Sequence, residues 1–189
     1  METFQVQAPI DAVWRFVLDP HMVAACMPGA ELEAVVDDHT FLGSIKVQVG
    51  AITTSYKGRV QFTQVDEQTC TVQMVAEGGE TGGGTAKGTM SSSLRSLPDG
   101  RTEVVAEASI DLTGRIVQVS RGMIQGVAHE LFQQFVACAK QRLETPPGVA
   151  EETMSATQNQ PIRIVPLILR VLWSAIVRFF RRLFRRPAA

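Results

Sequence analysis

The chain has 189 residues with 18 basic and 19 acidic side chains, and its net charge of −1 conceals two oppositely charged parts. The last 29 residues hold seven arginines and no acid, so residues 1–160 carry 11 basic against 19 acidic side chains, a net charge of −8. Such an acidic body excludes nucleic acid as a partner, because nucleic-acid binding needs a basic footprint.

A strand and two short helices are predicted at the start of the chain, the helices over Ala8–Leu18 and His21–Cys26. Phe4 and Val6 alternate with polar residues as on an edge strand, and Pro9 suits the first turn of a helix. The first seven residues lack the basic segment and apolar core of a secretory signal, so we expect the protein to stay in the cytoplasm.

Six further strands are predicted from the alternation of apolar and polar residues, which indicates an antiparallel sheet with one solvent-exposed face. They span Glu31–Val36, Thr40–Val49, Ile52–Val65, Thr69–Glu77, Thr85–Leu97 and Thr102–Leu112. The glycine run Gly78–Gly84 is predicted as a hairpin loop. A phosphate-binding loop would need a GK[ST] motif at the start of a helix, which this run lacks.

A long helix over Arg115–Leu143 closes the body, because its apolar residues recur every three or four positions. They are Ile116, Val119, Met123, Val127, Leu131, Phe135 and Cys138. The fold class is therefore α+β, with a curved antiparallel sheet of about seven strands around a long C-terminal helix and a cavity between them. We expect this body to span residues 1–144.

The rest of the chain divides into a linker and a tail. Residues 145–161 combine prolines with small and polar residues, which predicts a flexible linker whose r.m.s. reach is about 20–24 Å. Residues 162–189 are predicted to form a helix with arginines on one side and apolar residues on the other, which favours binding flat on an anionic membrane. The residues expected to bind it are Arg163, Arg170, Trp173, Arg178, Phe179, Phe180, Arg181, Arg182, Arg185 and Arg186.

Two other roles for the tail stay open. A transmembrane span is opposed by Arg170, since a charge at bilayer depth costs about 3 kcal/mol. The tail could instead dock onto a partner or onto its own body, although its polar face is purely cationic and a solvated face usually mixes both signs.

The cysteines and histidines indicate neither a disulfide framework nor a metal site. Cys26, Cys70 and Cys138 are odd in number and far apart, which predicts reduced thiols in the core. The three histidines are scattered and no HExxH motif occurs, so a metal centre lacks its ligands.

Several short motifs resemble the CoxG family of carbon monoxide dehydrogenase subunits, a group of membrane-associated proteins in the START-like (SRPBCC), helix-grip superfamily. The motifs are MPGAEL at 27–32, GSIKVQVG at 43–50, SYKG at 55–58, GGGTA at 82–86 and the ending LFQQFVACAKQRL of the long helix. The resemblance covers residues 1–144. It implies a helix-grip cavity, a task in helping a molybdenum hydroxylase-type dehydrogenase at the membrane, and a quinone-carrier role.

Adaptable methionines and aromatic residues are expected to line the cavity. The set is Met27, Phe41, Ile45, Tyr56, Phe62, Met74, Met90, Met123, Val127 and Leu131, and Tyr56, Ser120 and Gln125 could hydrogen-bond a polar head group. An ordinary packed core is the alternative. Gly82, Gly83 and Gly84 are expected to form a loop that docks a partner.

Three functions follow from these observations. The first is an accessory protein, peripheral on the cytoplasmic face of the cell membrane, that recruits a CO dehydrogenase-like molybdenum hydroxylase and carries an apolar redox ligand, a quinone such as menaquinone or ubiquinone. The second is a recruitment scaffold without a ligand. The third is an enzyme, as in START-like cyclases and hydrolases, but the inward-facing candidates are mostly apolar, so we predict no catalytic residues, no metal and no covalent cofactor.

Overall fold

The computed structural model describes residues 1–50, 52–114, 116–117 and 123–145, which fall within a compact unit spanning Met1–Ala150. Their elements are β1 (Glu2–Val6), α1 (Ile10–Leu18), α2 (Pro20–Cys26), β2 (Ala30–Asp37), β3 (Thr40–Val49), β4 (Ile52–Asp66), β5 (Thr71–Glu80), β6 (Thr85–Ser96), β7 (Thr102–Leu112) and α4 (Ile124–Glu144). None of the described helices combines the length and apolarity needed to cross a bilayer. The linker beyond Thr145 and the tail helix lie outside the described residues.

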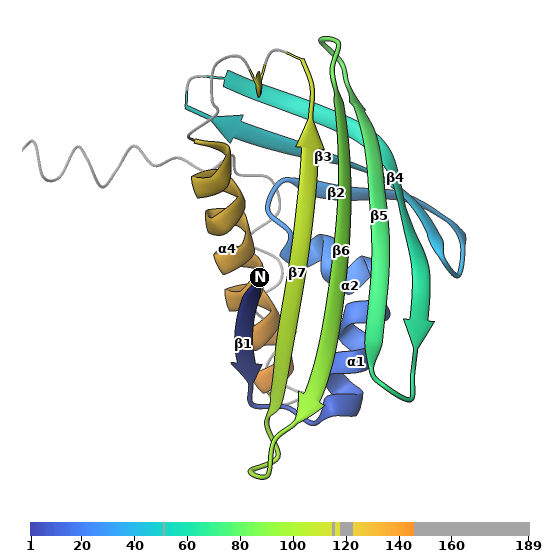
Figure 1. Cartoon of the computed structure of the whole chain (residues 1–189), viewed down its shortest axis with the longest axis vertical. Helices are drawn as coiled ribbons and strands as arrows, with labels where there is room; N and C mark the ends of the chain where they lie inside the picture. The colour runs from blue at the N-terminus through green and yellow to red at the C-terminus, as the bar shows by residue number, and fades with distance from the viewer. Residues whose placement is uncertain (51, 115, 118–122, 146–189) are drawn as a thin grey trace, which may run out of the picture. The chain divides into compact units, whose positions relative to one another are not determined.

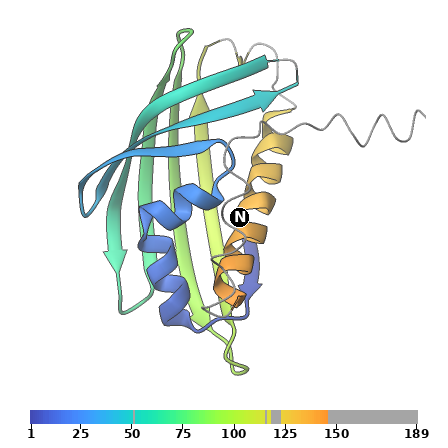
Figure 2. The ribbon, with the colours of Figure 1, turned by 180° about the vertical axis from the view of Figure 1, so that it is seen from behind.

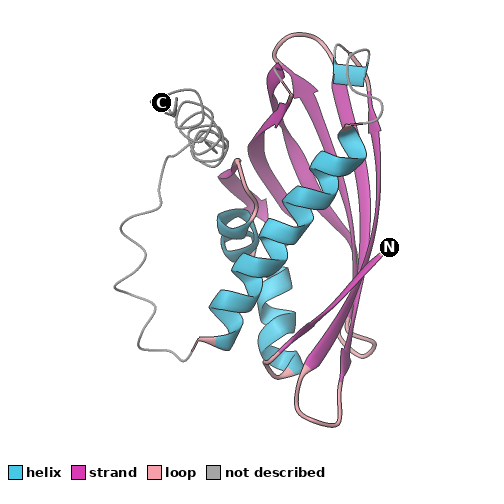
Figure 3. Ribbon diagram, turned by 90° about the vertical axis from the view of Figure 1, so that its left-hand side faces the viewer, coloured by secondary structure: helices cyan, strands magenta, loops and turns pink. Residues whose placement is uncertain are grey.

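The seven strands form one antiparallel sheet in the order β1-β7-β6-β5-β4-β3-β2. The sheet curves, and α1, α2 and α4 all lie on its concave side (Figures 1 and 2). Figure 3 shows α4 running along the open side of this curve. The predicted class, a curved sheet of seven strands around a long C-terminal helix, is confirmed.

Asp19 separates the two short helices. Its carboxylate accepts hydrogen bonds from the backbone N–H groups of His21 and Met22, at 2.8 and 3.2 Å, and so caps α2, while Pro20 occupies the first turn. Helix α1 turns Val13 and Phe16 into the core. Together the two helices fill one end of the concave face.

Glycine permits the sharp bend of the sheet. Gly43, Gly58 and Gly78 lie directly opposite one another on β3, β4 and β5. A Cβ on Gly58 would lie 2.0 Å from the carbonyl oxygen of Glu77, and one on Gly43 would lie 2.7 Å from that of Glu31, so only glycine fits where these strands approach. The row therefore marks the corner at which β3 and the first half of β4 fold over β5 (Figure 1).

The core lies toward the end of the sheet that carries the β6–β7 turn, here called the Asp99 end. One cluster joins Val6 and Val13 to Leu94 and Val104, a second joins Phe16 to Cys26 and Ala139, and a third joins Phe41, Phe62 and Val72. In the third cluster the rings of Phe41 and Phe62 meet edge to face with centroids 5.1 Å apart. These clusters hold α1, α2 and the second half of α4 on the sheet.

The structure corrects the expectation of three reduced thiols. Cys26 at the end of α2 and Cys138 in α4 form a disulfide across 112 residues, and only Cys70 is free. Spacing along the chain gave no sign of this pair because α2 and α4 meet only through the tertiary fold. The bond fixes α4 to α2 near the Asp99 end.

Two element boundaries also differ from the prediction. Strand β5 continues through Gly78 and Gly79 to Glu80, where a loop was expected, and of the two glycines only Gly78 lies close to a neighbouring strand, with its Cβ position 3.1 Å from the Lys57 carbonyl oxygen. The last helix was expected from Arg115. The described residues show helix at 116–117 and then α4 from Ile124, whereas Arg115 and residues 118–122 lie outside the description.

Candidate ligand-binding face

The concave face is packed at the Asp99 end and partly exposed at the other, which carries the β5–β6 turn and is here called the Gly83 end. On β7 the inward residues Val104 and Ala106 are buried, yet Ala108 and Ile110 on the same face are exposed, Ile110 by 55%. The inward and outward residues of β7 alternate without interruption, so the difference in exposure depends on what covers each part of the strand. An apolar part of the face is therefore accessible.

Six of the ten predicted cavity residues lie on the concave face of the sheet. Phe62, Met74 and Met90 stand in one cross-strand row, and Ile45 lies opposite Tyr56. Phe41 and Phe62 are buried in the third core cluster, whereas Met74, Met90 and Ile45 are partly exposed. The structure thus brings these residues onto one face, where Ile45 and Tyr56 lie nearer the Gly83 end than the phenylalanines and methionines.

The remaining four lie in α4 or at the ends of α2 and α4. Val127 and Leu131 are partly buried in the first half of α4, and Met27 caps the end of α2. Met123 precedes α4 and is 45% exposed, with its terminal methyl 3.0 Å from where a Cβ on Gly50 would lie. Met123 therefore lies at the β3–β4 turn.

A polar cluster at the Gly83 end joins Tyr56, a predicted hydrogen-bonding residue, to Thr54 and Glu80, which the sequence analysis did not foresee. Tyr56 and Glu80 are directly opposite each other on β4 and β5, and Thr54 follows on the same face of β4. The Thr54 hydroxyl donates to Glu80 Oε1 at 2.6 Å. Glu80 Oε2 and the Tyr56 hydroxyl are buried, and neither has a hydrogen-bond partner among the described residues.

The environment of this cluster raises the pKa of Tyr56, first because burial penalises the phenolate and second because the Glu80 carboxylate lies nearby. The neighbouring Thr54 hydroxyl acts in the opposite direction, although it lies outside hydrogen-bond geometry with the Tyr56 hydroxyl. Backbone encloses the carboxylate: a Cβ on Gly84 would lie 2.7 Å from Glu80 Oε2, and one on Gly114 would lie 3.3 Å from it. Gly84 therefore contributes to the site as well as to the turn.

The sequence held a signal for Glu80 that the loop prediction obscured. Val72, Met74 and Ala76 alternate on the inner face of β5, and continuing this period of two through Gly78 places Glu80 on that face. The run of glycines from Gly78 to Gly84 was instead interpreted as a loop. Thr54 was overlooked because threonine is common on either face of a strand.

Gly82, Gly83 and Gly84 form the turn between β5 and β6, as predicted. The Gly83 N–H donates to the Glu80 carbonyl at 3.1 Å, and Gly83 has a φ of 87°, a left-handed conformation that suits glycine. Gly82 and Gly83 are exposed. The turn is accessible to a partner, and its docking role stays a prediction.

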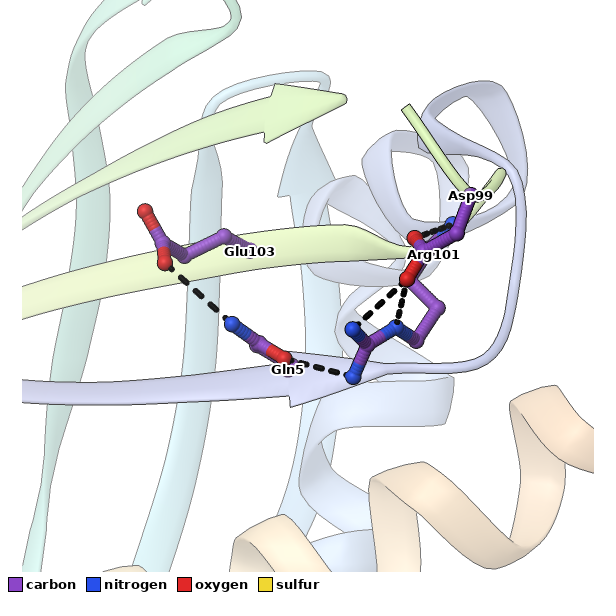
Figure 4. Close-up of polar contacts among 4 residues, drawn as sticks. All are labelled: Gln5, Asp99, Arg101 and Glu103. Atoms are coloured by element: carbon purple, nitrogen blue, oxygen red, sulfur yellow. Dashed lines mark hydrogen bonds and ion pairs between the residues drawn. The ribbon is translucent and has the colours of Figure 1, made fainter. Parts of the chain in front are cut away.

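A second polar cluster, at the Asp99 end, has a structural task. Arg101 donates to Asp99 through Nε at 2.7 Å and to Gln5 Oε1 at 2.7 Å, and Gln5 extends toward Glu103 (Figure 4). These contacts fasten β1 to the β6–β7 turn beside an open hollow lined by Gln7, Asp99, Gly100 and Arg101. Every charged group of the cluster has a partner, so it leaves no unsatisfied group for a ligand.

Two classes of predicted site remain. The arginines and aromatic residues expected to bind a membrane all lie outside the described residues, as do Ser120 and its neighbours at 118–122. Within residues 1–50, 52–114, 116–117 and 123–145, no three His, Cys, Asp or Glu side chains gather closely enough to hold a metal ion.

Comparison with known proteins shows both family and fold. Residues 3–144 match the CoxG family of carbon monoxide dehydrogenase subunits. Similar solved structures include a conserved protein from Geobacillus kaustophilus, with 15% identity, a TM-score of 0.68 and coverage of 75% of this chain and 92% of that one. The Zhui aromatase/cyclase from Streptomyces sp. R1128 has 16% identity, a TM-score of 0.54 and coverage of 76% and 91%.

A START superfamily protein from Mycobacterium smegmatis has 14% identity, a TM-score of 0.53 and coverage of 76% of this chain and 94% of that one. At these identities the likeness shows the fold alone. No curated protein sequence matches the chain.

Proposed function

Because the chain belongs to the CoxG family of carbon monoxide dehydrogenase subunits, we propose that it is a non-catalytic accessory protein. In this proposal it recruits a molybdenum hydroxylase-type dehydrogenase to the cytoplasmic face of the cell membrane and binds an apolar redox ligand, a quinone such as menaquinone or ubiquinone. The observation that carries the ligand is the accessible apolar part of the concave face, with Ile110 55% exposed.

The chemistry of this face fits an apolar ring with a small polar head. Ile110, Met90 and Met74 offer partly exposed apolar surface, and thioethers adapt their shape to a bound group. Tyr56 and Glu80 supply buried polar atoms at one end. Ligand sites commonly combine mostly apolar walls with a few polar groups that fix orientation.

The membrane part of the proposal rests on the tail sequence. Seven arginines within residues 161–189 would each contribute about 1 kcal/mol near anionic lipid, and the interspersed aromatic residues add apolar burial. Flotation with anionic vesicles tests it: the full chain should bind, while a chain ending at Glu144 should not. A variant with all seven arginines replaced by glutamine separates charge from apolar burial. Equal binding by the full and shortened chains would refute the tether.

Ligand binding is tested by extracting the purified full chain with organic solvent and identifying bound quinone by mass spectrometry. Titration of the emptied protein with 2-methyl-1,4-naphthoquinone should then quench the fluorescence of Trp14, which packs beside the core clusters. A Trp173→Phe background leaves Trp14 as the one tryptophan, since the chain has two. No bound quinone and no quenching would leave recruitment alone as the function.

Recruitment and location need separate tests. Deleting the chain should move the dehydrogenase from the membrane fraction to the soluble fraction of the cell. Disulfides are rare in the cytosol, so the Cys26–Cys138 bond is the observation that most opposes a cytoplasmic location. Alkylation of intact cells decides the point, because two trapped thiols at these positions indicate a reducing compartment and an intact bond an oxidising one.

A further inference from the structure

Tyr56 and Glu80 form the strongest unexplained feature of the concave face. Tyr56 is only 7% exposed, and its hydroxyl has no partner among the described residues, nor has Glu80 Oε2. Most buried polar side chains in native proteins are hydrogen-bonded, and leaving one unpaired is costly. Two such atoms on opposed cross-strand residues therefore point to one shared partner that the described residues do not provide.

A row without large side chains adjoins the two groups. The next cross-strand row toward the Asp99 end consists of Gly43, Gly58, Gly78 and Ala86, so across four strands no side chain larger than a methyl group rises from the concave face. All four residues are partly exposed. Beyond this row, on the same two strands, stand Val60 and Ala76. A flat ring laid across the row would touch apolar side chains on one edge and the polar pair on the other.

The two polar groups differ in their capacity to donate and to accept hydrogen bonds. The Glu80 carboxylate can only accept a hydrogen bond, and its Oε1 already receives one from Thr54. The Tyr56 hydroxyl can donate as well as accept. A ligand hydroxyl satisfies both atoms at once, since it donates to Glu80 Oε2 and accepts from Tyr56. A carbonyl can only accept, so it would leave Glu80 unpaired.

We propose that Tyr56 and Glu80, the latter oriented by Thr54, form a head-group site for an aromatic hydroxyl. The proposal rests on the proposed function and deepens it, because the hydroquinone form of a quinone carries such a hydroxyl and the oxidised form does not. A primary ammonium could also pair with Glu80, but the apolar surroundings disfavour a second buried charge. The site therefore holds the reduced form of the ligand more tightly than the oxidised form.

The test uses two redox-inert probes with the same ring, 1-naphthol and 1-methoxynaphthalene, titrated into the full chain by calorimetry. The naphthol should bind about tenfold more tightly, since a hydrogen bond to a charged acceptor commonly contributes that factor. Tyr56→Phe, Glu80→Met and Thr54→Val should each reduce the difference. Thr53→Val is the matched control, because Thr53 is the exposed neighbour of Thr54 on the opposite face of β4. It should keep the wild-type ratio.

Each outcome has a separate meaning. Equal affinity of the two probes for the wild-type chain overturns the head-group site while leaving an apolar ligand site in place. A preference for naphthol that all three site variants retain also overturns it. If neither probe binds, the proposed ligand function fails with it. Near-ultraviolet circular dichroism of each variant shows whether it is folded, and Tyr56→Phe, which removes one oxygen atom, is the variant on which the conclusion depends.

Discussion

Breaking the Cys26–Cys138 bond should destabilise the body by several kcal/mol. The bond joins residues 112 positions apart, and cross-linking a loop of that length removes unfolded-state entropy worth about 5 kcal/mol at 25 °C. Measured losses for native bonds in small domains span about 2–5 kcal/mol. Lost packing adds to the effect, because Cys26 is buried beside Phe16 and Ala139.

Urea unfolding at 25 °C of the wild-type chain and of Cys26→Ala/Cys138→Ala measures this loss. Reductant should lower the wild-type stability toward that of the double variant and leave the double variant unchanged. Cys70→Ala is the control, since Cys70 is a free thiol that also packs against a core cluster. A loss below about 1 kcal/mol, or no effect of reductant on the wild type, would refute the reasoning from loop length.

Two further predictions concern the corner of the sheet and the polar cluster. Gly58→Ala should cost about 1–3 kcal/mol in thermal unfolding because its Cβ would strike the Glu77 carbonyl, whereas Gly79→Ala, with nothing within 4 Å, should change stability by less than about 0.5 kcal/mol. Equal effects would contradict the close approach. Tyr56 is the one tyrosine in the chain, so the tyrosinate absorbance reports its pKa, which should lie above that of the unfolded protein and fall in Glu80→Gln. Because the folded state keeps the Tyr56 phenolic proton to a higher pH than the unfolded state does, the stability should decline as the pH rises above about 10. A titration midpoint of Tyr56 in the folded protein at or below that in the unfolded protein would contradict this prediction.

Most of the fold could be predicted from the alternation of apolar and polar residues along the strands. Thr40–Val49 and Thr102–Leu112 are strands with the predicted bounds, because apolar and polar residues alternate through both without interruption. Prediction failed at Gly78–Glu80, where glycine favours a loop by local propensity but serves here as the corner of a sheet. The local sequence cannot show the neighbouring carbonyl that makes glycine necessary.

The candidate site was predicted in part. Met74 and Met90 were assigned to the cavity as adaptable side chains on strands expected to face it, and the structure pairs them in one cross-strand row. Glu80 was missed because its position on the face depends on the length of β5. The Cys26–Cys138 pair was missed because it depends on how α4 crosses α2. Contacts between distant segments follow from the complete fold, and spacing along the sequence does not encode them.

The exposure of Ile110 supports a use for the concave face other than packing. Fully burying an isoleucine side chain stabilises a protein by roughly 1.5–3 kcal/mol, yet Ile110 stays 55% exposed while Val104 on the same face of β7 is buried. A chain selected for stability alone would cover Ile110 as it covers Val104. Since Tyr56 and Glu80 lie toward the same end with unpaired buried atoms, apolar and polar groups there are left unsatisfied together. A ligand with a hydroxyl head group at Tyr56 and Glu80 and an apolar part that extends along the concave face toward Ile110 would satisfy both.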